Sequence, residues 1–392
     1  MQEPRKLTPL ALKQLLEEDV RIPAVSIYTP MHWVVSTIHL SEEEIRLKNL
    51  KSKVVTAIKT RFGDDYIIEF SKKIDSILSD TTFLEHQTEG LLICACPGRF
   101  EMFYLPFDTN EYIAVADHFH LAPVLGLVND YREYYVLMLT QRHPALLKGD
   151  LYGLYPTNLQ LPESLKAGLG IDENGRENEQ QWSVSGANQT AGGISGFNGR
   201  GSDKNPARDD RLRFWRLIDQ LVVKHTNRDL PLILAGVTRE VAEYRALSRY
   251  PNLLPQHIDG GSGKNNLQEL YRSAMDVVRH NLIDRDHNQA IKQYLQLSGK
   301  TPRLTEADHT AILTQADAGR IDKLLLAAFH YTSDTIRDNN RPVPVISYPS
   351  PEYADDVNKV AQTVLNEGGK VINLDHASMP VKDVDMLAIL RY

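Results

Sequence analysis

The sequence has only two cysteines in 392 residues. A disulfide framework needs more thiols than this, and a structural zinc site needs further cysteines or histidines at fixed spacing. The two cysteines, Cys94 and Cys96, are one residue apart in the stretch LLICACPG. We therefore expect no disulfide between them, with one thiol in the core and one at the surface, and we expect no metal site.

Long apolar runs are also missing. No segment approaches the roughly 20 consecutive apolar residues that a membrane-spanning helix needs. The first residues, MQEPRKLTPLALKQL, contain no apolar core of a secretion signal. We expect a cytoplasmic protein without a membrane partner.

Positive charge is not in excess, because the formal net charge is −7. Such a chain does not coat nucleic acid through its bulk charge. Basic residues are nonetheless concentrated in two stretches. Residues 46–61 contain six basic residues and no acid, and residues 200–228 contain eight basic residues. Taken alone, either stretch is better explained as the solvated face of a helix.

The apolar pattern alternates between helix and strand periods in three segments, which is typical of an α/β fold. Breaks occur near Tyr112 and at DGGSGKNN, residues 259–266, which lacks the residue spacing of a phosphate-binding P-loop. The pattern predicts three α/β domains, over residues 1–111, 112–262 and 263–392.

Residues 167–210 show almost no apolar periodicity and are rich in glycine, asparagine and serine. A stretch of this length inside a compact domain is usually functional or disordered. The helical pattern DRLRFWRLIDQLVVKH follows it, and its apolar residues recur at three-to-four-residue spacing. This spacing predicts a buried stripe formed by Leu212, Trp215, Ile218 and Val222.

The order of these features resembles the archaeal and eukaryotic peptide-chain release factors and Pelota, and more closely the bacterial archaeo-eukaryotic release-factor family. Four elements carry the resemblance: EGLLICACPGRFEMFYLPFDTNEYIAVADHFHLAPVL, YYVLMLTQRHPALLKGD, GRGSDKNPARDDRLRFWRLIDQL with LPLILAGV, and GGKVINLD with MLAILRY. The resemblance implies a release-factor-like N-terminal domain, a ribonuclease-H-like middle domain and a ribosomal-protein-L7Ae-like C-terminal domain.

The resemblance also assigns a candidate site to the glycine-rich stretch. In release factors a Gly-Arg-Gly-Gly-Gln loop enters the peptidyl-transferase centre, where the glutamine helps to place water at the ester between peptide and tRNA. Here Gly199, Arg200 and Gly201 match that motif, while Ser202 and Asp203 stand where glycine and glutamine would be. These five residues are the candidate catalytic residues, although the Gly-Gly-Gln motif itself is not retained.

The motifs with which release factors read stop codons, Asn-Ile-Lys-Ser and a Tyr-Cys motif, do not occur in the first segment. The resemblance therefore implies no stop-codon reading, and the expected partners are the ribosome, rRNA or tRNA. Lysine and arginine that neutralise phosphates give sequence-independent affinity for RNA. The candidate RNA-binding residues are Arg208, Arg211, Arg213 and Arg216 in one stretch and Arg46, Lys48, Lys51 and Lys53 in the other; of the first group, Arg211, Arg213 and Arg216 are expected to face outward.

Three functions remain open from the sequence. The first is a ribosome-rescue hydrolase that acts on peptidyl-tRNA, and the second is a non-catalytic adaptor that binds the ribosome or RNA. The third is a nuclease with Asp203, Asp209 or Asp210 as metal ligands, but Asp209 and Asp210 are also explained by the preference for acids at a helix start. His118 and His120 are better explained as structural residues than as ligands. No cofactor is expected.

Overall fold

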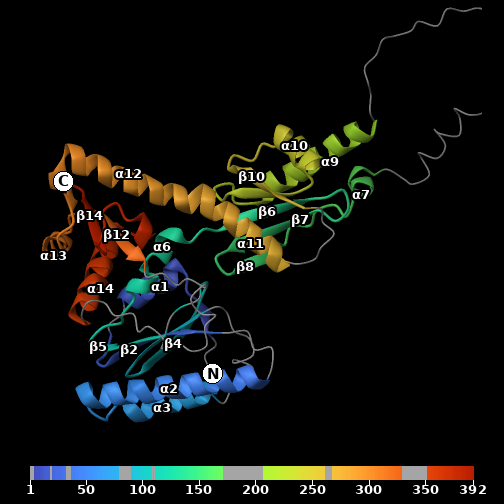
Figure 1. Ribbon diagram of the computed structural model, residues 1–392. Coiled ribbons are helices and arrows are strands. Elements are labelled where there is room, and N and C mark those ends of the chain that lie inside the picture. The colour runs from blue at the N-terminus through green and yellow to red at the C-terminus, as the bar shows by residue number, and fades with distance from the viewer. Residues whose placement is uncertain are drawn as a thin grey trace, which may run out of the picture. The chain divides into compact units, whose positions relative to one another are not determined.

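The computed structural model is a mixed α/β protein with three sheets (Figure 1). The structure describes residues 4–17, 20–31, 37–78, 90–107, 109, 111–170, 206–260, 267–328 and 351–392. The chain forms two compact units, one of Met1–Tyr131 with Ile283–Tyr392 and one of Arg132–Leu282. The first and third predicted segments thus contribute to one unit, and the three predicted domain boundaries stay a prediction.

The first sheet lies in the first unit and has the strand order β1-β4-β3-β2-β5. Its strands are β1 Arg5–Lys6, β2 Ala24–Pro30, β3 Gly90–Cys96, β4 Arg99–Leu105 and β5 Tyr112–Ala116. Strands β3 and β4 form the antiparallel hairpin that the sequence pattern predicts around its Pro-Gly turn, where Gly98 has a φ of 83°. Helices α2 Thr37–Phe62 and α3 Ile67–Leu78 cover one face of this sheet, and α1 Pro9–Glu17 packs against the other.

The prediction of one core and one surface thiol is wrong. Cys94 and Cys96 are both free and both buried. Residues two apart on a strand point to the same face, and this face of β3 belongs to the core that α1 covers. Burial raises the pKa of the Cys94 thiol far above its usual range, because the thiolate would lose its hydration.

The second sheet of the first unit has the order β11-β14-β12-β13. Its strands are β11 Thr305–Glu306, β12 Ile321–Ala328, β13 Lys370–Asp375 and β14 Met386–Leu390. The helices of this part are α12 Asp284–Lys300, α13 His309–Asp317 and α14 Pro351–Asn366, with 3-10 turns at Pro302–Leu304 and His376–Ser378. Strand β12 pairs parallel with β13 and antiparallel with β14.

A buried asparagine ties the two sheets of this unit together. Asn358 of α14 accepts hydrogen bonds from the backbone N–H groups of Leu121 (2.7 Å) and Ala122 (2.9 Å) and donates one to the carbonyl of Phe119 (3.1 Å). These contacts hold the start of the short helix α5 Ala122–Leu125, which is followed by α6 Leu127–Asp130. One apolar cluster runs from α1 through α5 to α14, so the N-terminal and C-terminal segments share a core.

The second unit contains the third sheet, with the order β10-β9-β6-β7-β8. Its elements are β6 Tyr134–Leu139, β7 Ala145–Asp150, β8 Gly153–Pro156, α7 Leu165–Leu169, α9 Pro206–His225, β9 Leu232–Gly236, α10 Thr238–Leu247, β10 Leu253–Asp259 and α11 Leu267–Val278, followed by a π-helical turn at Arg279–Ile283. Strands β6, β7 and β8 form an antiparallel meander, while β9 and β10 run parallel to β6. Helices α7, α9 and α10 pack on one face, and α11 contacts the edge strands β8 and β10 from the other.

In the described part of the chain, no helix is long and apolar enough to cross a membrane.

His120 gives the first unit a predicted pH dependence. Its side chain is buried beside the ring of Tyr112, with 5.0 Å between ring centroids. Burial lowers the pKa of His120 from 6.5 to about 4, with a smaller contribution from His118. Below pH 6.5 the unfolded chain takes up a proton that the folded chain does not, so stability is lost as the pH falls toward 4.

We therefore expect a His120→Gln variant to lack this loss. The difference in unfolding free energy between wild type and variant, measured by urea unfolding, is expected to shift by about 3 kcal/mol in the variant's favour between pH 7 and pH 4. A difference that does not change with pH would contradict the neutral, buried state of His120.

Candidate nucleic-acid interface

The inward face of α9 is built from large apolar side chains. Phe214, Trp215, Ile218 and Val222 are fully buried and pack against β6, β9 and α10. Their spacing of three to four residues places them along one side of the helix. The sequence prediction is confirmed for Trp215, Ile218 and Val222, whereas Leu212 is only half-buried.

A buried carboxylate fixes this side of the helix in place. Asp219 of α9, 1% exposed, accepts hydrogen bonds from the Tyr244 hydroxyl (3.3 Å), the Ser248 hydroxyl (2.8 Å) and the backbone N–H of Arg249 (3.2 Å). The Arg249 guanidinium lies 3.4 Å from its other oxygen. A buried charge is tolerated only when it is hydrogen-bonded in this way, so Asp219 fixes the rotation of α9 against the end of α10.

Arg211 does not face outward, and that prediction is wrong. The residue is 8% exposed, and its guanidinium binds Glu243 of α10 with Nη2 (2.9 Å to Oε1) and Nε (3.2 Å to Oε2). Nη1 donates to the carbonyl of Ala207 at 3.1 Å. The hydrogen bonds from Arg211 lower the pKa of Glu243 although burial acts against them. Arg211 therefore joins α9 to α10, and its donors are engaged within the protein.

The outward face of α9 carries a basic stripe, which we define as Arg213, Arg216 and Lys224. All three side chains are exposed, as is Gln220 between them. In the described part of the chain, no ion pair or side-chain hydrogen bond engages any of the three. The spacing of 3, 4 and 4 residues from Arg213 through Gln220 to Lys224 keeps them on one side of the helix. Arg208, one turn before Arg211, is also exposed.

Lys224 was missed by the sequence reasoning. Its position eight residues after Arg216, on the side opposite the buried stripe, is the signal that would have identified it.

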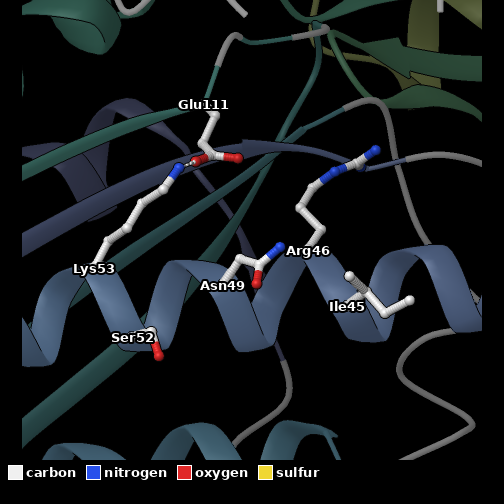
Figure 2. Close-up of a pocket in the computed structure, with 6 residues that line it drawn as sticks. All are labelled: Ile45, Arg46, Asn49, Ser52, Lys53 and Glu111. Carbon is white, nitrogen blue, oxygen red and sulfur yellow. Dashed lines mark hydrogen bonds and ion pairs between the residues drawn. The ribbon is translucent and has the colours of Figure 1, made fainter. Parts of the chain in front are cut away.

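The basic residues of α2 are in a different electrostatic state, because each has a partner within the protein. Lys48 pairs with Glu44 (3.2 Å), Lys51 with Asp75 (2.7 Å) and Lys53 with Glu111. Arg46 donates from Nη1 to the carbonyl of Pro30 at 3.1 Å. Figure 2 shows Arg46 and Lys53 rising from the same side of α2, with Lys53 reaching Glu111. Their role in RNA binding stays a prediction, but α2 offers less uncompensated charge than α9.

The five candidate catalytic residues, Gly199, Arg200, Gly201, Ser202 and Asp203, lie outside the described residues. The chain re-enters the described region at Pro206, the first residue of α9. Asp209 and Asp210 lie in its first turns, and Asp209 is exposed. Among the described residues, no group of three or more histidine, cysteine, aspartate or glutamate side chains is arranged to hold a metal ion.

The two histidines of the sequence analysis differ in environment. His118 is hydrogen-bonded through Nδ1 to the exposed carboxylate of Asp117 at 2.6 Å. His120 is buried in the core of the first unit.

Comparison with known proteins places this surface in a family context. Residues 134–280 match the model of the bacterial archaeo-eukaryotic release factor family 7, and this range lies within the second unit. The resemblance seen in the sequence is thereby confirmed for this part of the chain, which indicates a translation-related protein. The comparison with curated proteins found no match.

Solved structures with a similar chain course include three translation factors. The archaeal translation termination factor aRF1 is 13% identical, with 99% of both chains covered and a TM-score of 0.23. Dom34 of S. cerevisiae, a translation termination-like factor, is 14% identical, with 75% of this chain and 74% of that chain covered and a TM-score of 0.36. Archaeoglobus fulgidus Pelota is 12% identical, with 77% and 79% covered and a TM-score of 0.36.

The contrast between Arg211 and Arg213 can be tested by stability. Arg211→Met leaves the Glu243 carboxylate partly buried without its bidentate partner, so we expect a loss of about 2 kcal/mol in unfolding free energy. Arg213→Met removes an exposed, unpaired side chain and is expected to stay within about 0.5 kcal/mol of wild type. Denaturant unfolding of both variants measures the difference. Equal effects would show that Arg211 does not join the two helices.

Proposed function

We propose that this protein is a translation-associated factor that docks on the ribosome or on peptidyl-tRNA without reading stop codons. The observation that carries the proposal is the basic stripe of α9, which is exposed and unpaired in a region that matches a release-factor family. This helix directly follows the stretch that contains the candidate loop 199–203. A cationic helix next to a glycine-rich loop is suited to hold that loop against RNA.

The charge distribution supports RNA as the partner of α9. The whole chain is acidic, so attraction to phosphate has to come from a local surface. Arginine binds phosphate through a planar fork of donors, and Arg213 and Arg216 have no internal acceptor that competes for those donors. Each phosphate neutralised in this way releases counterions and adds affinity that does not depend on base sequence.

The topology of the second unit supports its proposed ribonuclease-H-like character. An antiparallel three-strand meander is extended on the side of its first strand by two parallel strands, with helices on both faces. We also propose that the sheet β11-β14-β12-β13 with its helices is the L7Ae-like part. Neither similarity by itself implies catalysis, because function depends on the residues of a site rather than on the fold.

Within this function, we favour docking without peptide release. Asp203 stands where release factors have glutamine, and a carboxylate lacks the amide donor that a glutamine provides. It would also be repelled by the phosphates that surround the ester. The proposed protein is therefore an adaptor in ribosome rescue, with a peptidyl-tRNA hydrolase as the second candidate because Gly199, Arg200 and Gly201 are retained.

Ribosome co-sedimentation tests the docking. The double variant Arg213→Glu/Arg216→Glu is expected to bind about tenfold or more weakly at moderate salt, and its binding should depend less steeply on salt concentration than that of wild type. The matched control is Arg272→Glu/Arg279→Glu, which reverses two exposed arginines on and just after α11. Absence of co-sedimentation at low salt, or equal weakening by both double variants, would contradict the proposal.

Peptide release from stalled ribosome complexes separates the adaptor from the hydrolase. We expect wild type to release peptide no faster than buffer, because Asp203 does not reproduce the amide of glutamine. Gly199→Val/Gly201→Val should then alter binding only, since a β-branched residue cannot adopt the backbone freedom of glycine. Release by wild type above the buffer rate, lost in the double valine variant, would establish the hydrolase instead.

A further inference from the structure

A pocket on the first unit is not used by the proposed function. Its volume is about 480 Å³, within the range of roughly 300–1,000 Å³ that small-molecule sites occupy. It lies between α2 and the residue that precedes β5 (Figure 2) and is lined by Ile45, Arg46, Asn49, Ser52, Lys53 and Glu111. Five of these six side chains come from two turns of one helix.

The charges in the pocket are placed at its two ends. Arg46 and Lys53 are seven residues apart on α2, which corresponds to about 10 Å along the helix axis. At the Lys53 end, the ammonium group is paired with Glu111, so a donor and an acceptor lie side by side. At the Arg46 end the guanidinium has no acid partner among the residues that line the pocket. Asn49 lies between the two ends (Figure 2).

The paired end has the chemistry that recognises guanine. The guanine ring presents a carbonyl acceptor, O6, beside the ring N1–H and the exocyclic N2–H₂ donors. An ammonium group donates to the carbonyl, while the second carboxylate oxygen of Glu111 accepts from the adjacent N–H groups. Adenine presents an amino donor in place of O6 and has no N2 amino group, so it would oppose a donor to Lys53 and leave Glu111 unsatisfied.

The other end has the chemistry that recognises phosphate. A guanidinium carries five donors in a planar fork that matches phosphate oxygens, and one donor of Arg46 is given to Pro30. The separation of about two helical turns suits a nucleotide whose base and phosphate lie at opposite ends. Asn49 and Ser52 add neutral hydrogen-bonding groups for the sugar, and Ile45, 56% exposed, adds apolar surface.

We propose that this pocket binds a guanosine that carries a phosphate, with Lys53 and Glu111 reading the base and Arg46 holding the phosphate. The same chemistry is present in a free guanine nucleotide and in a guanosine of an RNA strand. The site lies on α2 and does not depend on the stripe of α9, so it stands or falls separately from the proposed function.

Isothermal titration of the full chain with guanosine 5′-monophosphate tests the proposal. Adenosine 5′-monophosphate and inorganic phosphate are the comparison ligands, and we expect guanosine monophosphate to bind about tenfold or more tightly than either. A single-stranded RNA with one guanosine, and the same strand with adenosine in its place, form the second arm. Tighter binding of the guanosine strand than of the free nucleotide identifies RNA as the source, and the reverse identifies the free nucleotide.

Two variants and one control complete the experiment. Glu111→Gln is expected to weaken guanosine monophosphate about tenfold while leaving inorganic phosphate unchanged, and Arg46→Met should weaken both. Lys59→Ala is the control, because Lys59 is an exposed cation of the same helix that does not line the pocket. Thermal unfolding confirms that each variant is folded. Equal binding of the two mononucleotides, absence of binding, or equal effects of Glu111→Gln and Lys59→Ala would overturn the proposal.

Discussion

The rotation of α9 about its own axis is the constraint on which the proposed interface depends. Three kinds of contact set it: the apolar face around Trp215, the buried carboxylate of Asp219 and the bidentate pair of Arg211 with Glu243. Each would be lost by a turn of the helix, because each buried group would lose a partner that water does not replace. The same contacts therefore determine which basic side chains reach solvent.

Two arginines that are two residues apart have opposite roles as a result. Arg211 spends its donors on Glu243 and Ala207, and it acts as a link between α9 and α10. Arg213 lies on the exposed side and has no internal acceptor among the described residues. A comparable sorting occurs on α2, where Lys51 is tied to α3 through Asp75, and Lys53 is tied to Glu111. Counting basic residues in a sequence does not distinguish these cases, since what matters for a phosphate is whether the cation is already paired.

Local periodicity predicted the elements that carry their own signal. The buried positions Trp215, Ile218 and Val222 follow from a 3.6-residue period, and the hairpin of β3 and β4 follows from two apolar runs around a Pro-Gly turn. Contacts between distant residues could not be predicted in this way. Glu243 is 32 residues from Arg211, and Asn358 is more than 230 residues from the backbone that it binds. Neither partner leaves a trace in the pattern of its own segment.

The same reason explains why the shared core of the N-terminal and C-terminal segments was not foreseen. The family resemblance supplied the order of the segments, and the match of residues 134–280 supports it for the second unit. It did not show which side chains are paired. The role of the loop at residues 199–203 rests on its motif alone, and the glycines and Asp203 remain predictions of the sequence.

The central claim is that the outward face of α9 meets RNA on the ribosome, and site-specific crosslinking measures it directly. A photoreactive amino acid in place of the exposed Gln220 lies within the basic stripe, and one in place of the exposed Asp276 lies on α11. Irradiation of the protein bound to ribosomes is predicted to attach RNA at position 220 and not at position 276. Crosslinks to RNA only from position 276, or to protein alone from position 220, would contradict the account.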